Sequence, residues 1–265
     1  MQHLKLKSLN HFSIPQSELN EIEKLPVDIN GLKELEKSNI EGQKMITISG
    51  NGDLVQMFRY NFDGVFSFLP ESDPIILYLN LAQKQLMVVY TIRRKIQDTL
   101  REKSNENLSV ETFEYLSAAT VCATYTFLAL EAFINSIIPK DFKLPLINPE
   151  NGKFRNWKYK DILGGMPVLL KLKKVPQSLC KKSFHDQFPE KWKSIEQLKS
   201  LRDDIVHNKP DLGFTTNWQE KLYNELFNFN FLSTIADSVD YINFYKEGTI
   251  EFCECSFKED FEQLI

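Results

Sequence analysis

The sequence predicts a mainly α-helical protein, an antiparallel bundle of four long helices with a small antiparallel β extension on its N-terminal side. Beyond residue 72, apolar residues recur every three or four positions over four long stretches, which is the spacing of helices that bury one face. Before residue 72, runs of strand-forming residues flank a glycine-containing turn. We therefore expect three parts: an N-terminal extension (1–70), a helical domain (71–248) and a C-terminal tail (249–265).

The β extension is predicted from a hairpin pattern. Residues 45–49 and 54–60 are rich in strand formers, and the Gly-Asn-Gly-Asp sequence at 50–53 accepts the positive φ angles of a tight turn. Residues 64–69 are expected to add a third strand. Apolar residues alternate again at 249–257, which predicts a short strand that joins the N-terminal sheet.

The first two long helices are predicted directly after the β extension. Ser72-Asp73-Pro74 places capping residues ahead of a proline that suits the first helical turn, so we expect a helix from there to about residue 101. A second helix is expected over residues 109–138. Its predicted core stripe consists of Phe113, Leu116, Thr120, Ala123, Phe127, Leu130, Ile134 and Ile137.

The third and fourth long helices lie further along the chain. The third is expected to begin near Pro189 and to end at 208–210, because proline disfavours helix in the residue before it. The fourth is expected over residues 217–246. Between the second and third helices, proline and glycine interrupt the pattern, and short helices are predicted at 157–163 and 166–172.

Composition narrows the class of protein. The chain is 42% hydrophobic and 26% charged with a formal net charge of −4, which argues against coating nucleic acid by bulk electrostatics but leaves room for a local basic site. Four cysteines and four histidines have no zinc-ligand spacing, so no metal or cofactor is expected. The apolar segment 118–138 contains Glu131 and Asn135, which favours a buried helix over a membrane span. Residues 1–20 contain no continuous apolar run, so a cytoplasmic location is expected.

The motif with the clearest chemistry lies at the end of the third helix, where Arg202 is followed by His207. Arginine holds phosphate oxygens through its fixed fork of donors, and histidine transfers protons near neutral pH. Asp203 is one helical turn before His207, so its carboxylate is expected to orient the imidazole. The structural alternative is that both residues simply interact favourably with the helix C-terminus.

Two further groups accompany this motif. Glu131, with Asn135 one turn on, could face a cleft and hold Arg202, or could pair with a cation or a backbone donor between helices. A basic stretch could bind RNA phosphates, with an aromatic side chain to stack a base, or could be solvated. This stretch contains Lys171, Lys173, Lys174, Lys181 and Lys182, followed by Phe184 and His185.

Residues 201–208 resemble the R-φ-x-x-x-H motif of the HEPN superfamily, where φ is a polar residue, and residues 127–135 resemble the acid-bearing long helix of that family. The resemblance covers about residues 72–246. It implies an all-α domain that forms homodimers in which two motif helices line one cleft. It also implies a metal-independent endoribonuclease that acts as a toxin or antiviral defence effector.

The resemblance assigns a role to each motif residue. Arg202 would bind the scissile phosphate, and His207 would be the general base or acid for attack by the ribose 2′-hydroxyl. Asp203 would fill the polar position. The products would carry a cyclic phosphate and a 5′-hydroxyl.

Expected partners are RNA, a second copy of the chain and an antitoxin or sensor protein, but no membrane. Residues 1–70 would sense a trigger, contact a partner or shape the dimer. The main alternative is a non-catalytic HEPN-like binding or scaffold module in a larger assembly, and a third hypothesis is a helical adaptor unrelated to the family.

Overall fold

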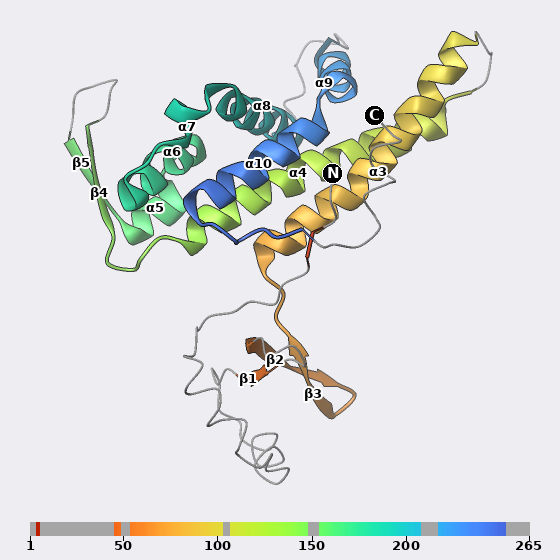
Figure 1. Cartoon of the computed structure of the whole chain (residues 1–265). Helices are drawn as coiled ribbons and strands as arrows, with labels where there is room; N and C mark the ends of the chain where they lie inside the picture. Colours follow the sequence, from red (N-terminus) through yellow and green to blue (C-terminus); the bar gives the residue numbers. More distant parts are fainter. Residues whose placement is uncertain are drawn as a thin grey trace. The chain divides into compact units, whose positions relative to one another are not determined.

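The computed structural model describes residues 4–5, 45–48, 54–102, 107–147, 154–207 and 217–252 (Figure 1). This part of the chain is mainly helical with small antiparallel sheets, as the sequence predicts. The chain divides into two compact units, Leu6–Pro74 and Met1–Lys5 with Ile75–Ile265. Of the described residues, the helical unit contains 4–5 and those from 75 onward.

The smaller unit contains a three-stranded antiparallel sheet in the order β1-β2-β3. Its strands are β1 (Met45–Ile48), β2 (Leu54–Phe62) and β3 (Val65–Pro70). Asp63 and Gly64 join β2 to β3 with φ angles of 48° and 82°, as a two-residue turn with positive φ requires. The backbone N–H of Gly64 donates to Oδ1 of Asn61 at 3.0 Å. The predicted strands are confirmed, whereas the predicted turn at 50–53 lies outside the described residues.

The two longest helices open the helical unit. Helix α3 (Pro74–Arg101) begins at the predicted proline, and α4 (Ser109–Ser136) ends two residues earlier than predicted. The predicted core position Phe113 is wrong, because its side chain is 72% exposed. Tyr115 lies in the core instead, and its hydroxyl donates to the carbonyl oxygen of Leu226 at 2.9 Å. The buried face of this first part of α4 is therefore rotated from the predicted stripe.

Helices α3 and α4 are also long and apolar enough to cross a membrane, judged by length and composition alone. The most apolar 18-residue window of α4 is 56% buried within the protein, and that of α3 is 39% buried. Core helices of soluble proteins pass the same test, so the finding is weak evidence for a membrane span.

The region after α4 differs most from the prediction. A two-stranded antiparallel hairpin, β4 (Lys143–Ile147) and β5 (Phe154–Lys158), precedes α5 (Tyr159–Gly165). The predicted helix at 157–163 therefore starts too early, because Trp157 pairs with Leu144 across the hairpin. Next come α6 (Val168–Cys180), which is longer than the predicted helix at 166–172, and α7 (Phe184–Gln187).

Helix α6 continues through Pro176 because another helix supplies the missing hydrogen bond. Proline has no N–H, so the carbonyl of Leu172, four residues earlier, lacks its usual helical donor. The hydroxyl of Tyr241 donates to this carbonyl at 2.7 Å. The buried tyrosine therefore stabilises the part of α6 that follows residue 172, where the sequence predicts the end of the helix.

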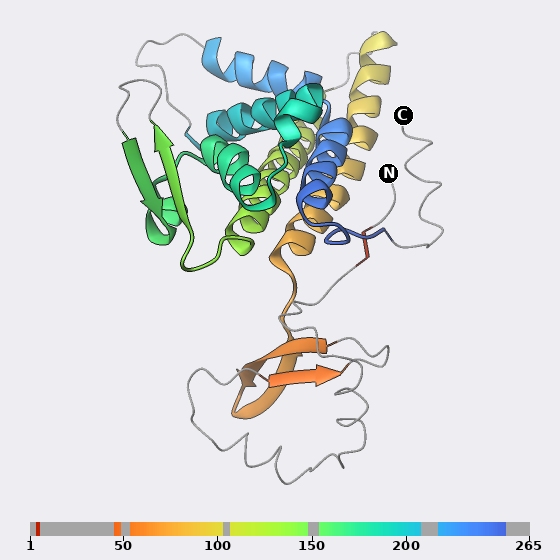
Figure 2. The ribbon, with the colours of Figure 1, turned by 60° about the vertical axis from the view of Figure 1, so that its left-hand side comes forward.

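The last helices complete the bundle. Helix α8 (Pro189–Val206) packs against α4 and against α10 (Phe231–Tyr245), and all three lie together in both views (Figures 1 and 2). The prediction of one helix over 217–246 is wrong, since α9 (Asn217–Asn228) ends before α10 begins. Asn230 marks the new start, because its side chain accepts a hydrogen bond from the backbone N–H of Ser233 at 3.1 Å.

The described part of the tail pairs with the beginning of the chain. Leu4 forms an antiparallel bridge with Phe252, and the backbone N–H of Lys5 donates to the carbonyl of Glu251 at 2.8 Å. The prediction that the tail joins the N-terminal sheet is wrong for these residues, while residues 253–257 lie outside the described part. Glu251 and Phe252 instead pair with Lys5 and Leu4, which belong to the helical unit.

Candidate functional site

The motif lies at the C-terminal end of α8, where Arg202 and Asp203 are helical and His207 directly follows the helix. The helix ends at Val206, slightly before the predicted end, and the backbone N–H of His207 donates to the carbonyl of Asp203 at 2.8 Å. The His207 side chain is exposed. Its imidazole makes no hydrogen bond or ion pair with any residue that the structure describes.

Arg202 lies at the contact between α8 and α4. Its guanidinium carbon is 5.4 Å from the ring centroid of Phe127, and Nη2 is 4.0 Å from Oε2 of Glu131. Nη1 donates to Oδ1 of Asp203 at 3.1 Å. The Nε atom is buried and has no hydrogen-bond partner in the described part of the chain. The structure thus brings Arg202 and Glu131 together and leaves one guanidinium donor unused.

Asp203 is held by cations on its own helix. Its carboxylate lies 2.6 Å from Nζ of Lys199 and accepts the hydrogen bond from Arg202. Burial raises the pKa of Asp203, but these two cations outweigh it and bring the pKa below its ordinary value. The expected contact between the Asp203 carboxylate and the His207 ring is absent from the described structure. Lys199, one turn earlier on the same stripe, takes that place.

Glu131 and Asn135 also face a second cation, Lys171 of α6. Lys171 is a buried residue, with only 4% of its surface exposed. Its Nζ donates to Oδ1 of Asn135 at 3.3 Å and to the carbonyl of Leu163 at 3.2 Å. Burial lowers the pKa of Lys171, and the negative charge of Glu131 opposes this shift. Lys171 is therefore no part of an exposed RNA-binding surface, contrary to its predicted role in the basic stretch.

The remaining lysines of that stretch occupy two places. Lys173 and Lys174 lie on α6, where Lys174 donates to Oε1 of Gln177 at 3.3 Å. Lys181 and Lys182 follow the helix and are exposed, and Nζ of Lys182 lies 4.7 Å from the ring centroid of Phe244.

The aromatic member of the predicted track does not fit its role. Phe184 is 1% exposed and packs edge-on against Tyr241 and Phe244, so it cannot stack a base. The hydrophobic neighbours that bury it come from α10, far along the sequence.

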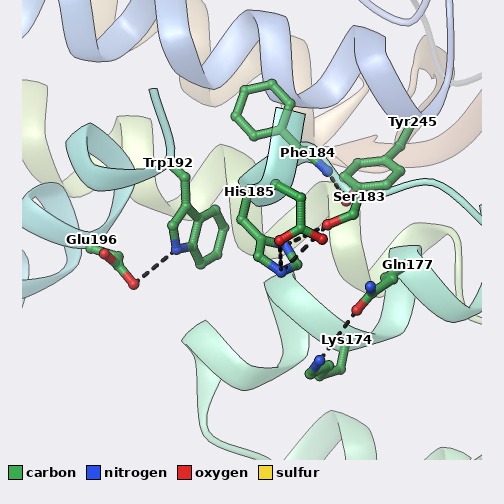
Figure 3. A network of polar contacts seen from close by, with 9 residues as sticks. Lys174, Gln177, Ser183, Phe184, His185, Trp192, Glu196 and Tyr245 are labelled. Atoms are coloured by element: carbon green, nitrogen blue, oxygen red, sulfur yellow. Dashed lines mark hydrogen bonds and ion pairs between the residues drawn. The ribbon is translucent and has the colours of Figure 1, made fainter. Parts of the chain in front are cut away.

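His185 belongs to a separate polar network around α7 (Figure 3). Its Nδ1 lies 2.9 Å from Oγ of Ser183, and Nε2 lies 3.3 Å from Oδ1 of Asp186. The ring packs against Trp192, whose indole N–H donates to Glu196 at 2.8 Å. Burial lowers the pKa of His185, with a further contribution from the nearby Lys173. The sequence analysis did not predict this network, although Ser183 two residues before His185 was a possible signal.

The hydrogen bonds of this network do not favour nucleophilic catalysis by Ser183. The Ser183 hydroxyl also hydrogen-bonds to Asp186, and this bond lowers the pKa of the Asp186 carboxyl. A serine nucleophile instead needs a base that takes its proton. Ser183 directly precedes α7 and Asp186 is the third residue of the helix, and the Ser183 side chain makes no capping hydrogen bond to the helix backbone.

Other candidate sites lie away from the motif. A cavity of about 570 Å³ is lined by polar side chains of α8 (190–197) and of the corner between α9 and α10 (225–237). Among the described residues, no group of three or more His, Cys, Asp or Glu side chains could hold a metal ion. Comparisons with protein-family models, with curated proteins and with solved structures found no match.

Proposed function

We propose that the chain is a metal-independent endoribonuclease of the HEPN type that acts as a toxin or antiviral defence effector. The observation that carries the proposal is the position of Arg202, whose guanidinium rests against Phe127 and Glu131 while its Nε atom is unpaired. An exposed histidine follows on the same helix end. Anion binding would thus come from the last part of α8, and proton transfer from the residue that directly follows the helix.

The reaction would use these two groups as follows. His207 in its neutral form takes the proton of a ribose 2′-hydroxyl, and the 2′-oxygen attacks the adjacent phosphorus. The bond from phosphorus to the 5′-oxygen breaks, which leaves a 2′,3′-cyclic phosphate and, after protonation, a 5′-hydroxyl. Arg202 stabilises the added negative charge on the phosphoryl oxygens in the transition state.

Partners follow from the same proposal. A second copy of the chain would bring a second motif helix to the cleft, so that one His207 acts as base while the other protonates the leaving oxygen. The smaller unit would contact a trigger, sensor or antitoxin. Lys173, Lys174, Lys181 and Lys182 would neutralise RNA phosphates near the cleft. The effector would act in the cytoplasm.

A second candidate is a non-catalytic binding or scaffold module of the same type. The observation that favours it is that two carboxylates, Glu131 and Asp203, already lie beside Arg202. Their charges balance a half-buried cation, as in a structural ion pair between helices. Such a module would retain its fold and partners without cleaving RNA.

The test is cleavage of total RNA and tRNA by the purified full chain in EDTA, next to a His207→Ala variant. We expect metal-independent cleavage with cyclic phosphate ends, and a loss of about 10²- to 10⁴-fold in the variant. Arg202→Lys keeps the charge but loses the fork of donors, so its activity should also fall. Thermal unfolding of both variants close to that of the wild type excludes misfolding as the cause.

The two candidates give different outcomes. Cleavage that persists undiminished in His207→Ala contradicts the proposed chemistry. If neither protein cleaves, and co-purification recovers a partner that both bind equally, the scaffold function replaces the enzyme.

A further inference from the structure

Five side chains of alternating charge lie near one another on three helices, and Lys171 interacts with the next of them, Glu131, electrostatically and not through an ion pair within 4.0 Å. The row starts at Lys171 on α6, crosses Glu131 on α4 to Arg202 on α8, and ends at Asp203 and Lys199. Arg202 is the central cation of the row and the group that would bind phosphate in the proposed function. Its availability therefore depends on how strongly its neighbours hold it.

Glu131 divides its charge between two cations. Its carboxylate is 4.0 Å from Arg202, which is longer than a charge-assisted hydrogen bond, and it also acts on Lys171 electrostatically. Asn135, one turn along α4 from Glu131, accepts a hydrogen bond from the Lys171 ammonium. Lys171 thus faces the same side of α4 as Glu131, and both Lys171 and Arg202 lie within the electrostatic influence of this carboxylate.

The burial of Lys171 needs an explanation. Only 4% of the Lys171 residue is exposed and its ammonium is bonded to two neutral oxygens, so the charge loses hydration, and a nearby carboxylate offsets part of that cost. An apolar residue would fill the same space between α6 and α4 without this cost. The remaining electrostatic interaction of Lys171 is with the Glu131 carboxylate.

We propose that Lys171 is a positioning residue which holds part of the Glu131 charge away from Arg202 and so leaves the guanidinium donors free for an anionic ligand. The proposal rests on the proposed function in naming that ligand as an RNA phosphate. Its physical core, the competition of two cations for Glu131, stands without it. Lys171 touches no substrate and acts only through Glu131.

The first experiment measures Arg202 directly, without RNA. The wild-type chain is treated with phenylglyoxal, and mass spectrometry of the peptide that contains Arg202 follows its rate of modification. Lys171→Met removes the competing charge, so Glu131 should pair fully with Arg202 and slow its modification about fivefold or more. Lys171→Gln keeps a donor for Asn135 but no charge, and it should slow the reaction equally.

The rescue variant separates electrostatics from structure. In Lys171→Met/Glu131→Gln the carboxylate is gone, so Arg202 should react at least as fast as in the wild type. The proposal is overturned if Lys171→Gln reacts at the wild-type rate, or if the slow rate persists in the double variant. Thermal unfolding accompanies each measurement.

The second experiment joins the inference to the proposed function. RNA cleavage and the binding of a 2′-deoxy oligonucleotide should both fall in Lys171→Gln and return in Lys171→Gln/Glu131→Gln. If the modification rates follow the prediction but no variant binds or cleaves RNA, the positioning role holds and the ribonuclease function fails. If RNA is cleaved equally by the wild type and Lys171→Gln, the positioning role fails alone.

Discussion

The two ends of α8 are held by different forces. Near its N-terminal end, Trp192 is 6% exposed and packs with His185 and Tyr241. Near its C-terminal end, Arg202 lies among charges, and its side chain is 23% exposed. Aromatic packing excludes water and fixes one geometry, whereas a row of charges leaves donors that a ligand can use.

The two described histidines show what this difference means for chemistry. The side chain of His185 is 10% exposed and partnered by Ser183 and Asp186, in surroundings that disfavour its charged form. The His207 side chain is exposed at the end of the helix. A histidine that must exchange protons with a substrate needs the second environment, and one that supports a fold suits the first.

The largest expected effect is at the packed end. Tyr241 is fully buried, with its ring against Phe184 and Phe133 and its hydroxyl on Leu172. Tyr241→Ala should lower the free energy of unfolding by about 3–5 kcal/mol, measured by urea denaturation. Tyr223→Ala is the matched control, since that side chain is 40% exposed, and it should cost less than about 1 kcal/mol. Equal losses of unfolding free energy in the two variants would contradict the difference drawn between packed and exposed aromatic positions.

The hydroxyl group of Tyr241 gives a smaller and more specific prediction. Tyr241→Phe leaves the Leu172 carbonyl with neither its side-chain donor nor an N–H from Pro176, so we expect a loss of about 1–3 kcal/mol. Tyr115→Phe also removes a buried hydroxyl, but the Leu226 carbonyl keeps the N–H of Phe229 at 3.4 Å. Its cost should be nearer about 1 kcal/mol. A Tyr115→Phe loss as large as that of Tyr241→Phe would contradict the role assigned to Pro176.

How far the sequence predicts the structure follows from the range of the interactions. Apolar periodicity predicts the long helices and the start of α3 at Pro74, because each depends on neighbours within a few residues. It does not predict that α6 passes through Pro176, since the donor comes from residue 241. Asn230, a good capping residue, indicates the break before α10. The apolar pattern continues on both sides of Asn230, so the pattern alone predicts one helix instead of two.

The candidate site divides in the same way. The local motif places Arg202 and His207 on one helix end, and the acid at position 131 does meet Arg202. The burial of Lys171 and Phe184 depends on the packing of α6 and α7 against the bundle, which spacing along the chain does not reveal. The partner of Asp203 was misjudged because Lys199 lies one turn earlier, at the same distance along the helix as His207 lies later.

His185, which packs near the N-terminal end of α8, should make the stability of the protein depend on pH. Burial and the nearby Lys173 and Lys174 lower its pKa in the folded state, while Asp186 and Glu196 act in the opposite direction. The unfolded chain therefore takes up a proton near the ordinary pKa of about 6.5, where folded His185 does not. Stability contributed by neutral His185 is complete above this pH and falls as the pH drops below it.

The measurement for His185 is urea denaturation at several pH values between about 5 and 8. In His185→Gln the decline in this window should become shallower than in the wild type. Equal slopes in the wild type and His185→Gln would show that burial of this ring has no energetic consequence.

The smallest expected effect tests the charged end. The hydrogen bonds from Lys199 and Arg202 lower the pKa of Asp203 against the effect of its burial, so the folded state keeps the carboxylate charged to a lower pH than the unfolded chain does. This contribution is present above the unfolded pKa of about 3.9 and is lost as the pH falls through the folded value. Because the side chain is 30% exposed, solvent screening limits it to below about 1 kcal/mol. Asp203→Asn should therefore be slightly less stable than the wild type at pH 7 and equal to it in acid, as measured by urea denaturation at both pH values. Convergence in acid would establish that the carboxylate stabilises this helix end only while it is charged, which is the condition under which it also competes with a phosphate for Arg202.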